Sequence, residues 1–118
     1  NSIMKDRTEI VFTSKTAKIA DVVKAMISNG YGIAAIENDD KTLFGVVTDG
    51  DIRRHIMNGL DRPIFEICST QPVAIDRNLN IVAAQKILNE NKVYTALVTN
   101  ESKVVGLLRM HDIICELA

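Results

Sequence analysis

The residues best suited to binding chemistry lie in the run Thr48-Asp49-Gly50-Asp51. A carboxylate such as that of Asp51 can accept hydrogen bonds from both hydroxyls of a ribose, and the Thr48 hydroxyl can donate to a phosphate oxygen. Gly50 would let a ligand approach the backbone closely. If the run opens a helix, the unpaired N–H groups of its first turn add donors for an anion. The four residues are therefore compatible with a nucleotide site.

The same run has a purely structural interpretation. Thr48 followed by Asp51 three residues later resembles a capping box, with Thr48 as N-cap and Asp51 at the third helical position. An acidic residue there also stabilises the helix dipole, by about 0.3–1 kcal/mol. Taken alone, the run leaves both interpretations open.

An internal repeat in the sequence favours the ligand-binding interpretation of the run Thr48–Asp51. The segment Gly45–Ile52 reads glycine, two apolar residues, three variable residues, aspartate and isoleucine, and Gly106–Ile113 reads the same about 61 positions later. Asp112 thus occupies the place of Asp51. One copy is too small to bury its own apolar face, whereas two copies packed together can.

Each copy is predicted to be strand–helix–strand–strand–helix. In the first, an apolar stripe with helical spacing runs from residue 19 to 27 and ends before Gly30, and two short apolar runs, 32–36 and 43–47, flank a turn. Thr48 opens a helix through Asn58. The second copy repeats this order, ending in a helix over 110–117. We expect an α+β fold with two repeats, 1–60 and 61–118, related by a pseudo-two-fold axis, with clefts between them.

These features resemble the tandem cystathionine-β-synthase (CBS) domain family, also called Bateman modules, over essentially the whole chain. The family signature Gly-apolar-x-Thr/Ser-x-x-Asp is matched at Gly45, Thr48 and Asp51. The second copy keeps its glycine and Asp112 but has Arg109 in place of Thr or Ser. The resemblance implies a regulatory pair that binds adenosine nucleotides or related ligands between the repeats and controls an attached enzyme or transporter.

A narrower resemblance concerns the run Thr48–Arg54 together with Met110–Ile113. It is similar to the C-terminal CBS pair of sugar-phosphate isomerases of the arabinose-5-phosphate isomerase type. This implies an N-terminal sugar isomerase (SIS) domain in the parent chain, a role in Kdo and surface-polysaccharide synthesis, and AMP, ATP or CMP-Kdo as regulatory ligand. The alternatives are a pair attached to a sugar nucleotidyltransferase, or a structural dimerisation module without a ligand.

Four further residues are candidates for the ligand site. Tyr31 could stack on a base or simply pack. Arg54 could neutralise a phosphate or pair with a neighbouring acid. Arg109 could contact a phosphate or carboxylate, or be an exposed arginine at a helix start. His111 takes the place of Gly50 in the second copy, so it could touch a ligand or remain solvated.

The remaining features mainly exclude functions. The 14 Lys and Arg residues balance the 15 Asp and Glu residues, which gives no case for nucleic-acid binding. No stretch approaches the roughly 20 apolar residues of a membrane span. Cys68 and Cys115 are isolated, as is typical of thiols in a reducing cytoplasm. With no nucleophile–base pair and no metal-ligand spacing, we expect no catalysis and no metal. A homodimer or higher oligomer is expected.

Overall fold

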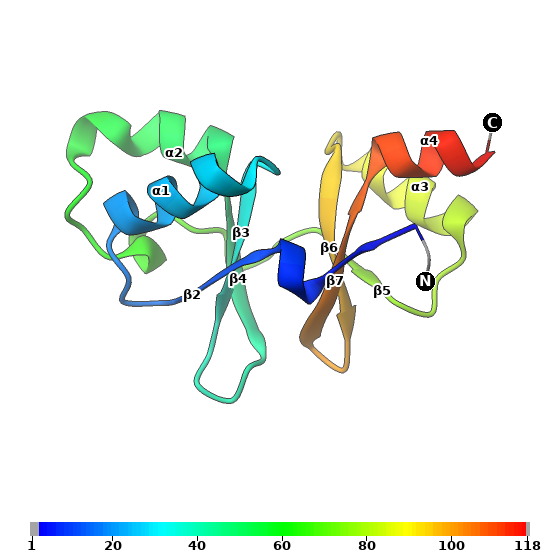
Figure 1. Ribbon diagram of the computed structural model, residues 1–118, viewed down its shortest axis with the longest axis horizontal. Helices are drawn as coiled ribbons and strands as arrows, with labels where there is room; N and C mark the ends of the chain where they lie inside the picture. Colours follow the sequence, from blue (N-terminus) through cyan, green and yellow to red (C-terminus); the bar gives the residue numbers. More distant parts are fainter. Residues whose placement is uncertain (1–2, 118) are drawn as a thin grey trace. The chain divides into compact units, whose positions relative to one another are not determined.

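The computed structural model describes residues 3–117 and divides into two units, named here after the residue that ends the last strand of each. The Thr48 unit is Ile10–Pro72; the Arg109 unit comprises residues 3–9 and 73–117 (Figure 1). The Thr48 unit contains β2 (Val11–Ser14), α1 (Ile19–Asn29), β3 (Ile33–Glu37), β4 (Leu43–Thr48) and α2 (Asp49–His55). The Arg109 unit contains β1 (Lys5–Asp6), β5 (Ala74–Asp76), α3 (Ile81–Glu90), β6 (Thr95–Asn100), β7 (Lys103–Arg109) and α4 (Met110–Leu117).

The Thr48 unit is a three-stranded sheet covered by two helices. The strand order is β2-β3-β4, with β2 parallel and β4 antiparallel to β3. The stripe predicted from the sequence faces the sheet: Ile19, Val22 and Met26 of α1 are buried in one cluster with Ala34 and Ile36 of β3. Gly30 caps α1 in the left-handed conformation, with φ of 87°, which its missing side chain permits. The helix therefore ends where the sequence predicts.

The Arg109 unit repeats this arrangement and adds a strand. Its sheet has the order β1-β7-β6-β5, and α3 and α4 lie along it in Figure 1. The two units correspond in register: Ile33 lies opposite Thr48 in one sheet, and Thr95 lies opposite Arg109 in the other. Both hairpins and both parallel pairs follow the predicted strand–helix–strand–strand–helix order. The predicted α+β fold is confirmed.

The strand β1 was not expected from the sequence. It pairs antiparallel with β7, with Lys5 opposite Leu107, and Arg7 Nη1 donates to the carbonyl of Val104 at 2.6 Å. The start of the chain thus packs with the second copy of the repeat. The division predicted at residues 60 and 61 describes which sequences correspond, whereas the spatial units reflect which segments pack together.

Element boundaries differ from the predictions by one or two residues at most strands. The helix expected from Thr48 through Asn58 is α-helical only to His55 and continues as a 3₁₀ turn, Ile56–Asn58, before Gly59. Such a change near a helix end is common, because the last carbonyls can accept i+3 bonds. The final helix begins at Met110, as expected.

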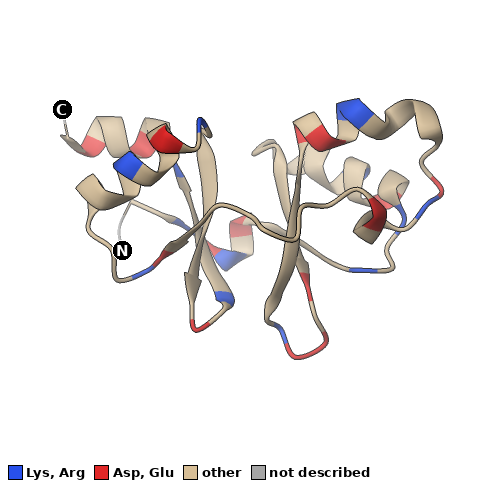
Figure 2. Ribbon diagram, turned by 180° about the vertical axis from the view of Figure 1, so that it is seen from behind, with Lys and Arg blue, Asp and Glu red and all other residues tan. Residues whose placement is uncertain are grey.

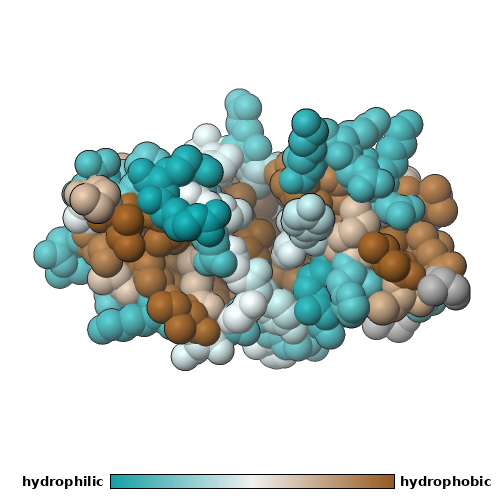
Figure 3. Space-filling model, turned by 90° about the horizontal axis from the view of Figure 1, so that it is seen from above, coloured by the Kyte–Doolittle hydropathy of each residue, from teal (hydrophilic) through white to brown (hydrophobic). Residues whose placement is uncertain are grey.

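Charges of both signs are interspersed along each unit in Figure 2, in line with the net charge of −1. No helix among residues 3–117 is both long and apolar enough to cross a membrane. The helices of each unit carry hydrophobic groups in contact with solvent (Figure 3). Ile27 and Met57 of the Thr48 unit are 77% and 93% exposed, and Val82 and Ile114 of the Arg109 unit are 62% and 54% exposed.

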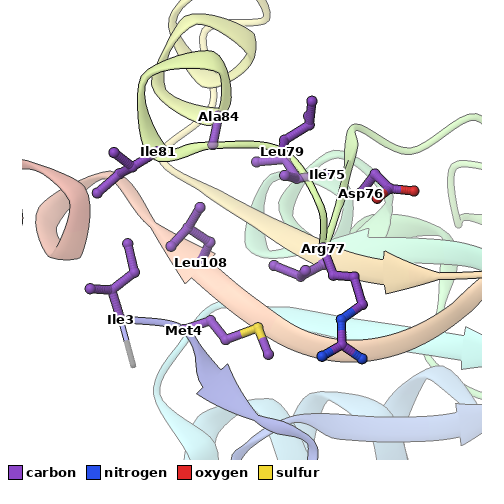
Figure 4. Close-up of a pocket in the computed structure, with 10 residues that line it drawn as sticks. Ile3, Met4, Ile75, Asp76, Arg77, Leu79, Ile81, Ala84 and Leu108 are labelled. Carbon is purple, nitrogen blue, oxygen red and sulfur yellow. The ribbon is translucent and has the colours of Figure 1, made fainter. Parts of the chain in front are cut away.

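The Arg109 unit also encloses a small cavity of about 20 Å³ under the start of α3. Figure 4 shows its lining: Ile3 and Met4 come from the N-terminal segment, Leu108 from β7, and Ile81 and Ala84 from α3. A space of this size is near the minimum for one water molecule. None of the site residues predicted from the sequence lines it.

Candidate functional site

Thr48 and Asp51 form the capping box that the sequence suggests. Thr48 ends β4 and is the N-cap of α2. Its hydroxyl accepts from the Asp51 N–H at 3.3 Å, and Asp51 Oδ2 accepts from the Thr48 N–H at 2.9 Å. The Thr48 hydroxyl also lies 3.1 Å from Asp51 Oδ2, to which it donates. The structural interpretation is therefore confirmed, and the box holds both ligand-binding candidates in fixed positions.

Arg54 and Gly50 complete the cluster in the Thr48 unit. Arg54 Nη2 donates to Asp51 Oδ1 at 2.5 Å. The Arg54 side chain is 66% exposed and that of Asp51 16%. A Cβ on Gly50 would lie 3.2 Å from Arg54 Nη1 and 3.6 Å from the Thr48 hydroxyl. Four of the residues predicted from the sequence thus lie together around one helix start.

Tyr31 lies near this cluster because the next residue, Gly32, contacts Asp49. Gly32 accepts the Asp49 N–H at 3.1 Å, and a Cβ on Gly32 would lie 2.7 Å from Asp49 Oδ2. Tyr31 directly precedes this contact, is partly buried, and donates its N–H to Asn29 Oδ1 at 3.3 Å. Its position before β3 is compatible with the predicted stacking on a base, which stays a prediction.

Sequence reasoning missed a segment that lies across β4. Val46 and Ser69 exchange backbone hydrogen bonds, at 2.9 and 2.8 Å. Burial is the main cause that raises the pKa of the adjacent Cys68 thiol, and the negative charge of Asp51 raises it further. Cys68 therefore lies within electrostatic reach of Asp51. No local sequence pattern predicts this contact, because some twenty residues separate the segment from β4.

The equivalent positions in the Arg109 unit are arranged differently. Arg109 donates from Nε to Asp112 Oδ2 and from Nη2 to Asp112 Oδ1, both at 2.9 Å. These bonds are the main reason why the pKa of Asp112 lies below its ordinary value, and the charges of Arg109, Lys5 and His111 act in the same direction. Both oxygens of Asp112 therefore have a charged donor.

His111 lies on α4 one residue after Met110, and its Nε2 is 3.7 Å from the Cys115 Sγ. Together with Arg109 it lines an open groove of about 390 Å³, whose other lining residues are Tyr94, Thr95, Met110 and Ile114. The structure thus brings together three of the predicted residues, Arg109, His111 and Asp112. Among residues 3–117 no group of three or more His, Cys, Asp or Glu side chains could hold a metal ion.

Comparison with models of protein families identifies the family of this chain. A profile of the CBS domain matches residues 2–58 and again residues 64–118. The chain belongs to the CBS domain family. The two copies of the repeat are two CBS domains, so the resemblance noted from Gly45, Thr48 and Asp51 is confirmed.

Curated relatives connect this CBS pair with longer proteins. The arabinose 5-phosphate isomerase KdsD of Escherichia coli K12 is 26% identical over 117 residues, which is 97% of this chain and 36% of KdsD. An uncharacterized protein of Chlamydia muridarum is 25% identical over 118 residues, 93% of this chain and 36% of that protein. The chain spans about a third of the length of these relatives.

Solved structures agree with the CBS fold. CBSX2 in complex with AMP superposes with a TM-score of 0.84 at 18% identity, covering 98% of this chain and 92% of CBSX2. The CBS domain pair of MJ0100, in complex with 5′-methylthioadenosine and S-adenosyl-L-methionine, also has a TM-score of 0.84, at 16% identity and the same coverage. At these identities the likeness shows the fold.

Proposed function

We propose that this CBS pair is a regulatory module that binds a nucleotide or nucleotide-sugar through the Thr48–Asp51 cluster. The observation that carries the proposal is the fixed position of Asp51, whose carboxylate is held beside the Thr48 hydroxyl at a helix start in a chain of the CBS family. The complexes of CBSX2 with AMP and of the MJ0100 pair with adenosyl compounds support an adenosine-type ligand.

The contacts of Asp51 suggest how the ligand is taken up. Its Oδ2 belongs to the capping box, while its Oδ1 is engaged by Arg54, whose side chain is mostly exposed. Exposed ion pairs are worth about 0–1 kcal/mol, so a ribose hydroxyl can replace Arg54 at small cost. Arg54, once displaced, would pair with a phosphate of the same ligand. Thr48 redirects its hydroxyl to that phosphate.

The proposed regulatory target is an attached sugar-phosphate isomerase with a SIS domain. Support comes from the KdsD relative, of which this chain spans 36%. A ligand that prefers one packing of the CBS pair would shift the population of states felt by the catalytic domain. CMP-Kdo, a late product of the route that such an isomerase feeds, and AMP or ATP are the ligands to test first. The module itself would regulate without catalysing.

Titration calorimetry of the 118-residue chain with AMP, ATP, CMP and CMP-Kdo tests the proposal. We expect one of them to bind and Asp51→Ala to weaken it at least about tenfold, a loss of about 1.4 kcal/mol. Asp39→Ala, in the β3–β4 turn, is a matched control that should bind normally. Binding that survives Asp51→Ala, or no heat with any ligand, would refute the site.

A second candidate function is assembly, favoured by the exposed apolar side chains on the helices. Ile27 and Met57 in one unit, and Val82 and Ile114 in the other, leave apolar surface in contact with solvent. A homodimer formed through these helices would bury it. Light scattering should show a dimer in the wild type and a monomer in Met57→Glu or Ile114→Glu. A wild-type monomer at all concentrations would contradict assembly.

A further inference from the structure

The two CBS domains differ at the residue that ends the last strand. Thr48 lies opposite Ile33, and Arg109 lies opposite Thr95, which is the equivalent position in the other sheet. A threonine hydroxyl at this place donates one hydrogen bond, as Thr48 does to Asp51. An arginine presents a planar fork that matches both oxygens of a carboxylate. The exchange therefore changes what the following aspartate can bind.

Asp112 is engaged on both oxygens by one side chain. The Nε and Nη2 atoms of Arg109 lie 2.9 Å from Oδ2 and Oδ1, and the two side chains are only 31% and 16% exposed. Bidentate binding of the two adjacent hydroxyls of a ribose would use the same edge of the Asp112 carboxylate as the Arg109 fork, so both charged donors would have to leave that edge together. A pair of neutral hydroxyls would replace a bidentate ionic contact, which is stronger than neutral hydrogen bonds.

The ionic competition at Asp51 is weaker. Its Oδ2 accepts from the N–H and hydroxyl of Thr48, which are neutral donors. Its Oδ1 accepts one ionic hydrogen bond from Arg54, whose side chain is 66% exposed at the surface of α2. The contact is to a single oxygen and comes from a side chain on the helix, three residues further along. The Arg109 fork, by contrast, starts from the end of β7 and includes the Nε atom, which leaves the guanidinium few alternative orientations.

We propose that Arg109 is the residue that restricts nucleotide binding to the first CBS domain, so that each chain binds one nucleotide through Asp51 and none through Asp112. The inference rests on the proposed function of the Thr48–Asp51 cluster and extends it. It makes Arg109 a specificity-determining residue that acts on the ligand through Asp112.

Calorimetric stoichiometry with AMP tests this proposal, with CMP-Kdo as probe if AMP does not bind. The wild-type chain should bind one equivalent, and Asp51→Asn should abolish binding. Arg109→Thr, which recreates the family signature, should bind a second equivalent that disappears in Arg109→Thr/Asp112→Asn. Lys86→Thr removes one positive charge from an exposed place in the same unit and should leave the stoichiometry at one.

Several outcomes would overturn the role of Arg109. Two equivalents in the wild type, or a single equivalent in a folded Arg109→Thr variant, would each do so while leaving the Thr48–Asp51 site in place. Loss of binding in Asp112→Asn instead of Asp51→Asn would also refute it. If no variant binds, the proposed function fails and the restriction fails with it. Carbon-13 NMR of the Asp112 carboxyl checks the contact separately: Arg109→Thr should raise the pKa of Asp112, and an unchanged pKa would show that the fork does not exist in solution.

Discussion

Gly45 lies directly against the backbone of Ser69. A Cβ atom at position 45 would be 2.5 Å from the Ser69 carbonyl oxygen and 3.2 Å from the Cys68 Sγ. The second CBS domain has the same relationship, since a Cβ on Gly106 would lie 2.8 Å from the Lys5 carbonyl oxygen. The repeated glycine therefore has a packing role in both copies: it lets a distant segment lie across the last strand.

This relationship predicts that Gly45→Ala destabilises the fold by about 1–3 kcal/mol, the usual cost of forcing an atom into a packed site. The backbone of residues 68 and 69 must shift, because no flexible side-chain end can simply move away. Gly50→Ala is the control. Its Cβ would meet the mobile end of Arg54 at 3.2 Å, and alanine favours a helix, so stability should be unchanged or raised. Equal urea midpoints for Gly45→Ala and wild type would contradict the packing role.

The N-terminal segment should contribute to the stability of the Arg109 unit. Met4 packs against its core cluster and borders the cavity under α3. We expect Met4→Ala to cost about 1–3 kcal/mol, somewhat less than a fully buried methionine, because Met4 is only partly buried. Lys86→Ala, at an exposed residue of the same unit, should change the unfolding free energy by less than about 0.5 kcal/mol. Similar unfolding curves for both variants would show that the segment is not part of the unit in solution.

The sequence predicts the elements of each copy well because their signals are local. The helical stripe from Ile19 to Met26, Gly30 as its end and the capping box at Thr48 each depend on residues within a few positions. The strand β1 carries no such signal: Lys5 and Asp6 are polar, and their partners in β7 lie about a hundred residues away. Only the fold brings these segments together.

The candidate site was predictable to the same extent. The cluster around Asp51 consists of residues within about two helical turns of one another: Thr48, Gly50, Asp51 and Arg54. A sequence motif can therefore identify these residues, and the structure brings them together. The approach of Cys68 and Ser69 was not predictable, since it depends on a bridge to Val46. The sequence did not predict the ion pair between Arg109 and Asp112, because an exposed position for Arg109 at the helix start was equally compatible with it.

The ion pair of Asp112 predicts a particular pH dependence. Because its pKa is lowered in the folded state, the pair stabilises the fold above the unfolded pKa of about 3.9, and this contribution is lost as the pH falls through the folded value. Asp112→Asn should therefore destabilise the chain at pH 7, and the difference from wild type should shrink below about pH 4. Glu116→Gln, at an exposed carboxylate on the same helix, should show a smaller effect at pH 7. A destabilisation by Asp112→Asn that is constant down to pH 2 would rule out an ionic origin.

The two cysteines should differ in reactivity. Cys68 is partly buried and its pKa is raised, so it forms less thiolate, whereas Cys115 is exposed. An aromatic disulfide reagent at pH 8 should label Cys115 at least about tenfold faster than Cys68, as read by mass spectrometry. Cys115→Ser should leave only the slow phase, and Cys68→Ser only the fast one. Equal rates in the native state would contradict the contacts of the 68–69 segment.

The most direct test of the account is whether Asp51 senses the ribose hydroxyls of the ligand. The measurement is the ratio of the dissociation constants of AMP and 2′-deoxy-AMP, or of the corresponding cytidine nucleotides, in the wild type and in Asp51→Asn. Removing the 2′-hydroxyl should weaken wild-type binding about tenfold, near 1.4 kcal/mol, and should change binding to Asp51→Asn by less than about twofold. An equal ratio in both proteins would mean that Asp51 does not hold the ribose, and would contradict the central claim.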